Sequence, residues 1–462
     1  MDASVTKNPG KKSIFEYIAG LNSSVYLFIA TVIALIAANS PLADWYFAFL
    51  NIPISFSVGG FDIFAVHGHT MNVALFVNDV LMVAFFFTVG LEIKHELMEG
   101  SLSNFRDAIL PVIAAMGGMI MPVLVYLAIG HGPLQIHGAA IPMATDIAFS
   151  LAVLALLGSK VPTTLKVFLM TLAVADDIGG IIVIAVFYSG GINLLALGLG
   201  ILTALIAFGL GFTKIRWLWL YYLLFFICWL FFLHSGVHAT IAGVLMGLVI
   251  PHKPLSSRGE LLNKLKWMST ELEAAKRKEL PSHYFMEDDL LQKVFSAKVT
   301  LTNTYNLTQR MFRQVSPFVN YVILPLFAFI NAGVTLGTFD MLQITGIPLA
   351  ITLGLLVGKT VGIFGATWLA CKVGIAHYPE HMTTKNLFGL SIFGGIGFTV
   401  ALFLATLAFD PSVVGPTGGQ LLNEAKMGVL VGSLLSGIAA YFTLKAILNK
   451  EHKDKERLSA AA

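Results

Sequence analysis

The stretch Thr-Leu-Ala-Val-Ala-Asp-Asp-Ile-Gly-Gly-Ile-Ile, residues 171–182, places Asp176 and Asp177 side by side in the middle of an apolar run. An ionised side chain at the centre of a bilayer costs roughly 2.5 to 3.5 kcal/mol on insertion scales, so such residues are rare there and by default indicate an ion or proton site. The rest of the chain must therefore provide a scaffold that tolerates two adjacent carboxylates.

The composition places the chain in a membrane. Of its 462 residues, 56% are hydrophobic and 12% are charged, and the mean hydropathy is +0.81, whereas about 25% of the residues in an ordinary soluble domain are charged. The net charge of +3 is too small to indicate a nucleic-acid partner. Cys228 and Cys371 both lie in apolar runs, so neither a disulfide framework nor a thiolate metal site is expected. The sequence predicts an all-α polytopic membrane protein surrounded by lipid.

Apolar segments long enough to span a bilayer recur along the whole chain. A transmembrane helix needs about 20 mostly apolar residues, and about 12 such segments are present. Their approximate boundaries are 23–42, 72–95, 108–129, 139–158, 164–189, 193–213, 217–233, 236–251, 317–336, 346–371, 386–409 and 425–448.

The loops between these segments alternate in charge. Cytoplasmic loops are expected to hold the Lys and Arg residues, and the even-numbered loops contain them, whereas the odd-numbered loops contain none apart from Lys426 beside the last segment. This alternation predicts that both termini are cytoplasmic and that the first apolar segment is retained as a helix. The predicted division is a tail at 1–22, helices 1–8 at 23–251, a charged insertion at 252–316, helices 9–12 at 317–448 and a tail at 449–462.

Two of the loops are unusually long. Residues 43–71 contain two short alternating runs around Gly59 and Gly60, which predict a small extramembrane β-hairpin. Because an isolated hairpin is marginal in water, we expect it to pair with a partner subunit; a loop lying on the membrane surface is the alternative. Residues 252–316 hold eleven Lys or Arg and seven Asp or Glu, and the stretch 271–279 predicts a solvated, charged helix. A plain solvated insertion and a regulatory segment both remain open.

Two of the apolar segments look interrupted. Pro142 lies four residues before Asp146 in the fourth segment, and an internal proline removes a backbone hydrogen bond. The eleventh segment contains three glycines between Phe393 and Thr399. Broken helices at corresponding positions of two inverted repeats are typical of the substrate site of a secondary transporter. Asp146 could then compensate the positive helix N-termini, and Lys359 in the tenth segment the negative C-termini.

The charged groups in these segments suggest competition between two cations. Burial and a neighbouring like charge favour the protonated form of one carboxyl of Asp176 and Asp177, and a nearby Lys359 favours the ionised form of its partner. Na+ is a hard cation and needs deprotonated oxygen ligands, so Na+ and protons should compete. Thr145 could add a hydroxyl oxygen, or could only satisfy the backbone at the helix break. For Asp79, in the second segment, structural and functional roles are both open.

Several short motifs together resemble the bacterial NhaA-type sodium/proton antiporters, over about residues 14 to 448. The motifs are Val-Asn-Asp (77–79), Val-Gly-Leu-Glu-Ile-Lys-His-Glu-Leu (89–97), Ala-Thr-Asp-Ile-Ala-Phe (144–149), Ala-Val-Ala-Asp-Asp-Ile (173–178), Ser-Gly-Val-His-Ala-Thr (235–240), Leu-Pro-Leu-Phe-Ala-Phe (324–329), Val-Gly-Lys (357–359) and Gly-Ile-Gly-Phe-Thr (395–399).

The resemblance implies an electrogenic antiporter, not an enzyme, that expels Na+ or Li+, takes up more than one H+ per cycle and needs no cofactor. It implies that Asp177 is the main Na+ ligand and that Asp176 pairs with Lys359 until the cation displaces it. Thr145 would lie at the cation site, and Asp146 and Lys359 would balance the helix ends of two crossing helices.

The resemblance also implies a pH-responsive cytoplasmic network that contains Glu92, Glu96 and His238. From the residues alone, His238 is either a sensor, since an unperturbed histidine titrates near physiological pH, or an ordinary hydrogen-bonded side chain. The family further implies a homodimer, formed through the hairpin in 43–71, in the bacterial inner membrane. One departure is His95, which stands where relatives commonly have arginine.

Two other functions are weaker candidates. A Na+-coupled symporter of a small solute would need a second polar cluster for its substrate, and the apolar segments contain none beyond the Asp and Lys set. An intramembrane aspartyl protease needs two aspartates that face each other from separate helices, whereas Asp176 and Asp177 are consecutive and about 100° apart on one helix.

Overall fold

The structure is a computed structural model. It describes residues 23–59, 61–62, 64–66, 69–130, 132, 134–213, 215–254, 256–277, 288–335, 346–380, 382–410 and 414–461. The predicted tail at 1–22 and the end of the predicted charged helix, Lys278 and Glu279, lie outside the described residues.

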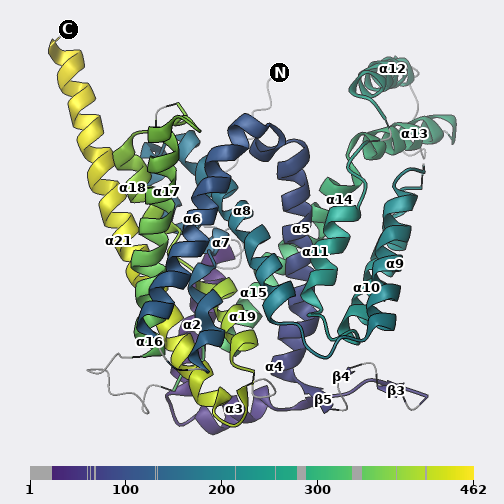
Figure 1. Cartoon of the computed structure of the whole chain (residues 1–462). Helices are drawn as coiled ribbons and strands as arrows, with labels where there is room; N and C mark the ends of the chain where they lie inside the picture. The colour runs from purple at the N-terminus through teal and green to yellow at the C-terminus, as the bar shows by residue number, and fades with distance from the viewer. Residues whose placement is uncertain are drawn as a thin grey trace. The chain divides into compact units, whose positions relative to one another are not determined.

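The described chain is mainly helical (Figure 1). The α-helices are α2 (Ser23–Ala38), α3 (Ala43–Leu50), α4 (Val73–Phe76), α5 (Met82–Met98), α6 (Phe105–Ile129), α7 (Ile147–Ala155), α8 (Thr163–Phe187), α9 (Leu194–Leu210), α10 (Leu218–Leu233), α11 (Thr240–Val249), α12 (Arg258–Arg277), α13 (Asp288–Thr304), α14 (Leu307–Phe318), α15 (Leu324–Asn331), α16 (Ile347–Leu353), α17 (Lys359–Val373), α18 (Thr384–Phe393), α19 (Phe398–Ala408) and α21 (Gly418–Ala461). Short 3-10 helices are η2 (Ser101–Ser103), η3 (Gln135–Met143) and η4 (Gly158–Lys160). The π-helical turns among the described residues are η1 (Val77–Leu81), η5 (Val319–Ile323) and η7 (Gly354–Gly358).

Several of these helices can cross a membrane. By length and apolar composition, six helical stretches of the described chain qualify, and up to nine if each of three bent helix pairs counts as one span. The six stretches are Val73–Met98, Phe105–Ile129, Thr163–Phe187, Leu307–Asn331, Ile347–Val373 and Gly418–Asp454. The predicted polytopic helical membrane protein is thus confirmed at the level of class. Cys228 and Cys371 are both free.

Two of the bent pairs coincide with the segments that contain Pro142 and the glycine cluster. The axis turns by 43° between η3 and α7, and by 49° between α18 and α19. The third pair, α2 and α3, turns by 115°. Helix α3 lies inside the loop predicted at 43–71 and was not expected from the sequence.

The predicted small hairpin is present. Strand β2 (Ser57–Val58) pairs antiparallel with β3 (Phe61–Asp62), and Val58 lies opposite Phe61. Gly59 has φ +60°, a left-handed conformation that glycine adopts without strain. A second, three-stranded sheet has the order β1-β5-β4 and is built from β1 (Pro53–Ile54), β4 (Ala65–Val66) and β5 (His69–Asn72).

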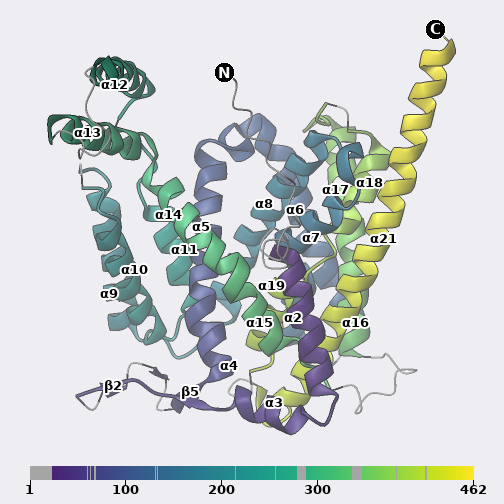
Figure 2. The ribbon, with the colours of Figure 1, turned by 180° about the vertical axis from the view of Figure 1, so that it is seen from behind.

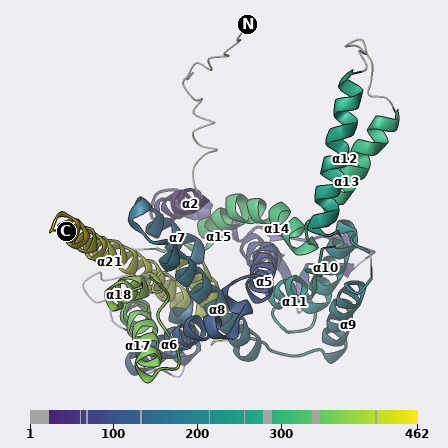
Figure 3. The same cartoon turned by 90° about the horizontal axis from the view of Figure 1, so that it is seen from above.

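The insertion predicted at 252–316 is largely helical. Helices α12 and α13 lie side by side (Figure 3), and α12 covers residues 271–277 of the predicted charged helix. The ninth apolar helix starts earlier than the predicted residue 317, because α14 continues through η5 into α15 without a break. The apolar count missed α14 because polar residues cover much of it, while Leu307 and Met311 on its other face are buried.

The chain divides into two compact units. The first unit comprises Met1–Asn78, Asn104–Tyr188 and Phe318–Ala462, and the second comprises Asp79–Ser103 and Ser189–Pro317. Within the first unit, α15 packs along α2 (Figure 2) and α21 packs against α16 and α18. Within the second unit, α5 packs against α11 and α9 packs against α10.

Close backbone contact joins α6 to α17 in the first unit. A Cβ atom at Gly117 would overlap the carbonyl oxygen of Gly362, and a Cβ atom at Gly362 would overlap that of Gly117. Helices in lipid use small residues in this way, since close approach supplies the van der Waals contact that no hydrophobic effect provides there. The contact lies one turn after Lys359, so it also sets the position of that residue.

We therefore expect Gly362→Ala to lower the melting temperature of the purified protein in detergent. The added methyl group must force the two backbones apart, and overpacking of this kind costs about 1–3 kcal/mol. Gly365→Ala is the matched control on the same helix, because a Cβ atom there meets nothing within 4 Å. Equal melting temperatures for the two variants would contradict the close contact.

Candidate functional site

The segments at the two bends cross each other in the first unit. The backbone N–H of Asp146 donates to the carbonyl of Ile396 at 2.7 Å, and the Thr145 hydroxyl donates to the carbonyl of Gly394 at 2.9 Å. The Ser150 hydroxyl donates to the carbonyl of Phe393 at 3.1 Å. The crossing segment thus satisfies carbonyls at and just beyond the end of α18. Compensation of the helix C-termini by Lys359 stays a prediction.

Asp146 caps two helices at once. Its Oδ1 accepts a hydrogen bond from the backbone N–H of Phe149 at 2.9 Å, in the first turn of α7. Its Oδ2 accepts from the backbone N–H of Thr399 at 3.1 Å, in the first turn of α19, and from the Thr399 hydroxyl. A carboxylate at a helix N-terminus satisfies free N–H groups and the helix dipole. One buried carboxylate therefore serves both helix N-termini, as the sequence analysis expected of Asp146.

Lys359 and Asp176 form a buried ion pair. The Lys359 ammonium donates to Oδ2 of Asp176, and the two side chains are 1% and 3% exposed. The half-buried Asp177 adds a further attraction for the ammonium group. The π-helical turn η7 immediately precedes Lys359, and such turns frequently occur at functional sites. The pairing expected from the family resemblance is present.

The other oxygen of Asp176 is the notable atom of the site. Oδ1 is buried and has no hydrogen-bond partner among the described residues. The Thr145 side chain lies beside this carboxylate, but its hydroxyl donates to Gly394. A buried carboxylate oxygen without a donor is costly, and either a proton or a cation would satisfy it. The structure therefore brings Thr145, Asp176 and Lys359 together, with Asp177 next along α8.

The residues assigned to pH response do not form one cluster. In the second unit, Nε2 of His238 lies 3.6 Å from Oδ1 of Asp79, and Nδ1 lies 2.8 Å from the Thr240 hydroxyl. Glu92 and Glu96 lie on the same continuous helix as Asp79, but Glu92 is about 20 Å further along it at 1.5 Å per residue. His238 is thus placed opposite Asp79, away from the two glutamates.

Sequence reasoning missed two polar partners. Thr399 was noted only as the end of the glycine motif, although a hydroxyl residue just after a helix break is a possible capping partner for Asp146. The second is the buried pair of Asn331 and Asn78, in which the Asn331 amide donates to the Asn78 side-chain oxygen at 2.8 Å. Asn78 stands beside Asp79 in the motif at 77–79, and that was the available signal.

The fold and this site define a polytopic membrane protein with a buried ion pair between Lys359 and Asp176. The family described as Na+/H+ antiporter 1 matches residues 18–444. A protein from Parabacteroides distasonis with the name Na(+)/H(+) antiporter NhaA is 46% identical over 93% of this chain and 94% of its own length. Proteins of the same name from Porphyromonas gingivalis and Escherichia coli are 45% and 41% identical, over 94% and 92% of this chain and 96% of their own lengths. The chain belongs to this family of Na+/H+ antiporters, which are transporters rather than enzymes.

The double cap predicts a graded loss of stability at Asp146. In Asp146→Ala, the N–H groups of Phe149 and Thr399 lose their acceptor, and each unsatisfied buried donor costs about 1–3 kcal/mol. Asp146→Asn keeps one oxygen and should have a smaller effect on the melting temperature in detergent. As a control, Asn193→Ala removes the cap of α9 at an exposed position, where water can replace it. If Asp146→Ala is no more destabilising than Asn193→Ala, the double cap is wrong.

The buried pair predicts a non-additive double mutant. Lys359→Gln leaves Asp176 without its counter-charge, and breaking a buried pair from one side costs about 3–5 kcal/mol. The double variant Asp176→Asn with Lys359→Gln removes both charges and should be more stable than Lys359→Gln alone. Melting temperatures of the two single variants and the double variant test this expectation, and additive effects would argue against the pair.

Proposed function

We propose that this antiporter expels Na+ in exchange for H+ at the carboxylates of Asp176 and Asp177. One observation carries the assignment to these residues: Asp176 Oδ1 is buried without a donor, while Oδ2 of the same carboxylate pairs with Lys359. A proton or a Na+ ion can satisfy that oxygen, but not both at once, because Na+ needs the deprotonated form.

The exchange follows from this competition. Na+ would bind to oxygens of Asp177, Asp176 and Thr145, since hard cations prefer oxygen ligands. Its positive charge would weaken the hold of Lys359 on Asp176. When the site opens to the other side of the membrane, Na+ leaves and protons take its place. Li+ is a second expected substrate because it is also a hard monovalent cation.

We infer a transmembrane arrangement of about 12 spans with inverted-topology repeats. Six long helices, three bent pairs and three shorter apolar helices, Leu194–Leu210, Leu218–Leu233 and Thr240–Val249, support this number. The bends beside Asp146 and Gly397 would be the interruptions of the fourth and eleventh spans. Both termini would be cytoplasmic, in the inner membrane of a bacterium, with the division into tails, helix groups and the charged insertion given above.

Three further properties extend this proposal. Uptake of more than one H+ per Na+ would make the exchange electrogenic. Glu92 and Glu96 near the end of α5, together with His238 beside Asp79, would adjust the activity to pH. A homodimer would form through the β-hairpin within 43–71, whose strands are too short to be stable alone in water.

The alternative functions are not favoured. Membership of an antiporter family argues against a symporter. An aspartyl protease would need a second carboxylate facing Asp176 from another helix, whereas the described residue in that position is Lys359.

Asp177→Asn should abolish Na+-dependent proton flux in everted membrane vesicles, because an amide cannot exchange a proton for Na+. The variant should still insert and purify normally, since the Asp176 and Lys359 pair remains. Adding NaCl, LiCl or KCl at mildly acidic to alkaline pH gives the ion selectivity and the pH response of the parent protein in the same assay.

Asp44→Asn is the control, because it makes the same chemical change at an exposed position at the start of α3. It should keep the parent flux. Unchanged Na+-dependent flux in Asp177→Asn would overturn the assignment of the ion site, although not the membership of the family.

A further inference from the structure

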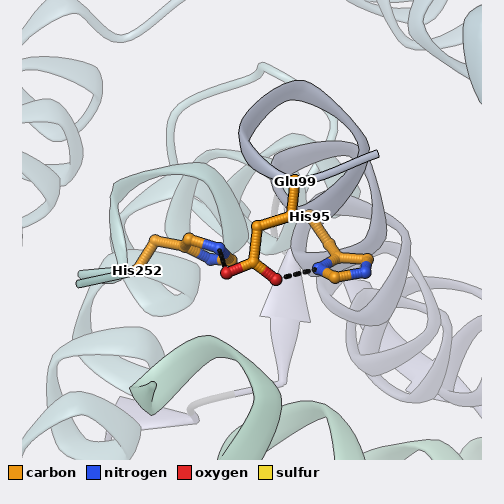
Figure 4. A group of neighbouring side chains, drawn as sticks. All are labelled: His95, Glu99 and His252. Carbon is orange, nitrogen blue, oxygen red and sulfur yellow. Dashed lines mark ion pairs between the residues drawn. The ribbon is translucent and has the colours of Figure 1, made fainter. Parts of the chain in front are cut away.

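A separate group of three side chains lies in the second unit, away from the carboxylate pair in sequence and in chemistry. Figure 4 shows His95, Glu99 and His252 pointing toward one another. Nε2 of His252 is 3.0 Å from Oε1 of Glu99, and Nδ1 of His95 is 3.5 Å from Oε2. One ligand atom from each residue lies within 4.8 Å of the other two.

Local structure brings two of the three residues to one side of α5. His95 and Glu99 are four residues apart, which places them on the same helix face. The backbone N–H of Glu99 donates to the carbonyl of His95 at 2.8 Å, so this last turn is formed. The same spacing lets two side chains of one helix share a metal ion in known zinc motifs.

His252 is held beside α5 by contacts that do not involve the group itself. It follows the end of α11, and the Lys94 ammonium of α5 donates to the carbonyls of Leu248 at 2.7 Å and of Ile250. The Thr308 hydroxyl donates to the carbonyl of Pro251 at 3.4 Å. These contacts fix the backbone just before His252 beside α5 without any ligand.

Nε2 of His252 faces two different polar groups, the Glu99 carboxylate and the Asn306 amide. The side-chain amide nitrogen of Asn306 lies 3.4 Å from the same Nε2, and its orientation is fixed because Asn306 Oδ1 accepts from the N–H of Gln309 at 2.7 Å. If Nε2 carries a proton, it faces the amide donor of Asn306. If Nε2 carries a lone pair, it can accept from the Asn306 amide, and a cation would then be held between this nitrogen and the Glu99 carboxylate oxygen.

We propose that His95, Glu99 and His252 form a binding site for a divalent transition-metal ion, in the first place Zn²⁺. Two imidazoles and one carboxylate with an open fourth position form a known zinc ligand set. Zinc–ligand bonds of about 2.0–2.2 Å place tetrahedral donor atoms about 3.3 Å apart. The nitrogen–oxygen separations here, 3.0 Å from His252 to Oε1 of Glu99 and 3.5 Å from His95 to Oε2, are close to this value. Na+ prefers oxygen ligands, so this site differs in chemistry from the proposed transport site.

The exposure of two of the three ligands favours access by a metal ion. The Glu99 side chain is 46% exposed and the His95 side chain is 45% exposed, whereas His252 is buried. A bound ion would link the end of α5 to the segment after α11. Because it binds only the folded protein, it should raise the melting temperature as its concentration rises above the dissociation constant.

The test uses the full-length protein in detergent, purified without a polyhistidine tag. Co²⁺ is the probe, because its visible absorption reports tetrahedral coordination, and Zn²⁺ should displace it in competition. We expect a Co²⁺ band that Zn²⁺ removes and a rise in melting temperature on adding Zn²⁺. His252→Gln and Glu99→Gln should each weaken the apparent affinity at least about tenfold, since outer partners alone account for 10–100-fold.

Two further variants keep the test decisive. His252 is buried, so His252→Gln could fail to fold, and size-exclusion chromatography without metal would reveal this. In that case the test depends on His95→Arg and Glu99→Gln, which change half-exposed ligands. His377→Gln changes an exposed histidine outside the group and should bind Zn²⁺ like the parent protein. A parent protein without a displaceable Co²⁺ band would overturn the site. Ligand variants that bind as tightly as the parent would do so as well. Neither result depends on whether Asp177 carries Na+.

Discussion

The buried ion pair between Lys359 and Asp176 is the constraint on which the first unit depends. Each charge is tolerated away from water only because the other lies against it. The pair therefore requires α8 and α17 to stay in register, and the backbone contact of Gly117 with Gly362 fixes α17 one turn further on. A π-helical turn lies just before Lys359, and such turns frequently occur at functional sites.

The crossing at Asp146 meets a related requirement for the backbone. Non-helical chain at membrane depth must find its hydrogen bonds within the protein, because lipid offers none. Here the two interrupted segments supply each other, through the Asp146 N–H and the carbonyl of Ile396 and through the carboxylate that caps α7 and α19. Among the described residues, Oδ1 of Asp176 and Oγ of Ser436, which lies beside Gly395, are buried polar atoms near the crossing without a hydrogen-bond partner. The Asp176 carboxylate therefore keeps one oxygen that lacks a hydrogen-bond donor and that a proton or a cation can satisfy.

The second unit uses different means. Its α5 and α11 approach through Gly90, Gly243 and Gly247, whose Cβ atoms would meet backbone of the opposite helix. The Lys94 ammonium donates hydrogen bonds to carbonyls at the end of α11. This contact places His252, which follows α11, beside the last turn of α5. The side chains of His95 and Glu99 are more exposed than that of Lys359, so they are available to bind an ion without being part of the exchange site.

The sequence determined what depends on local composition. Apolar length indicated the membrane helices, the glycines at 59 and 60 predicted the hairpin turn, the charged stretch from 271 predicted a helix, and four charges in apolar segments marked Asp146, Asp176, Asp177 and Lys359. Each of these signals is contained in one short stretch of the chain.

Only the tertiary structure decided which groups meet. Thr399 reaches Asp146 from 253 residues away, His238 lies opposite Asp79 and not beside Glu92, and His252 completes a group with His95 and Glu99. Pairings of this kind depend on helix packing, and no periodicity or spacing in the sequence encodes them. The polar helix α14 was missed for the same reason, since its helicity depends on a buried face that only its neighbours define.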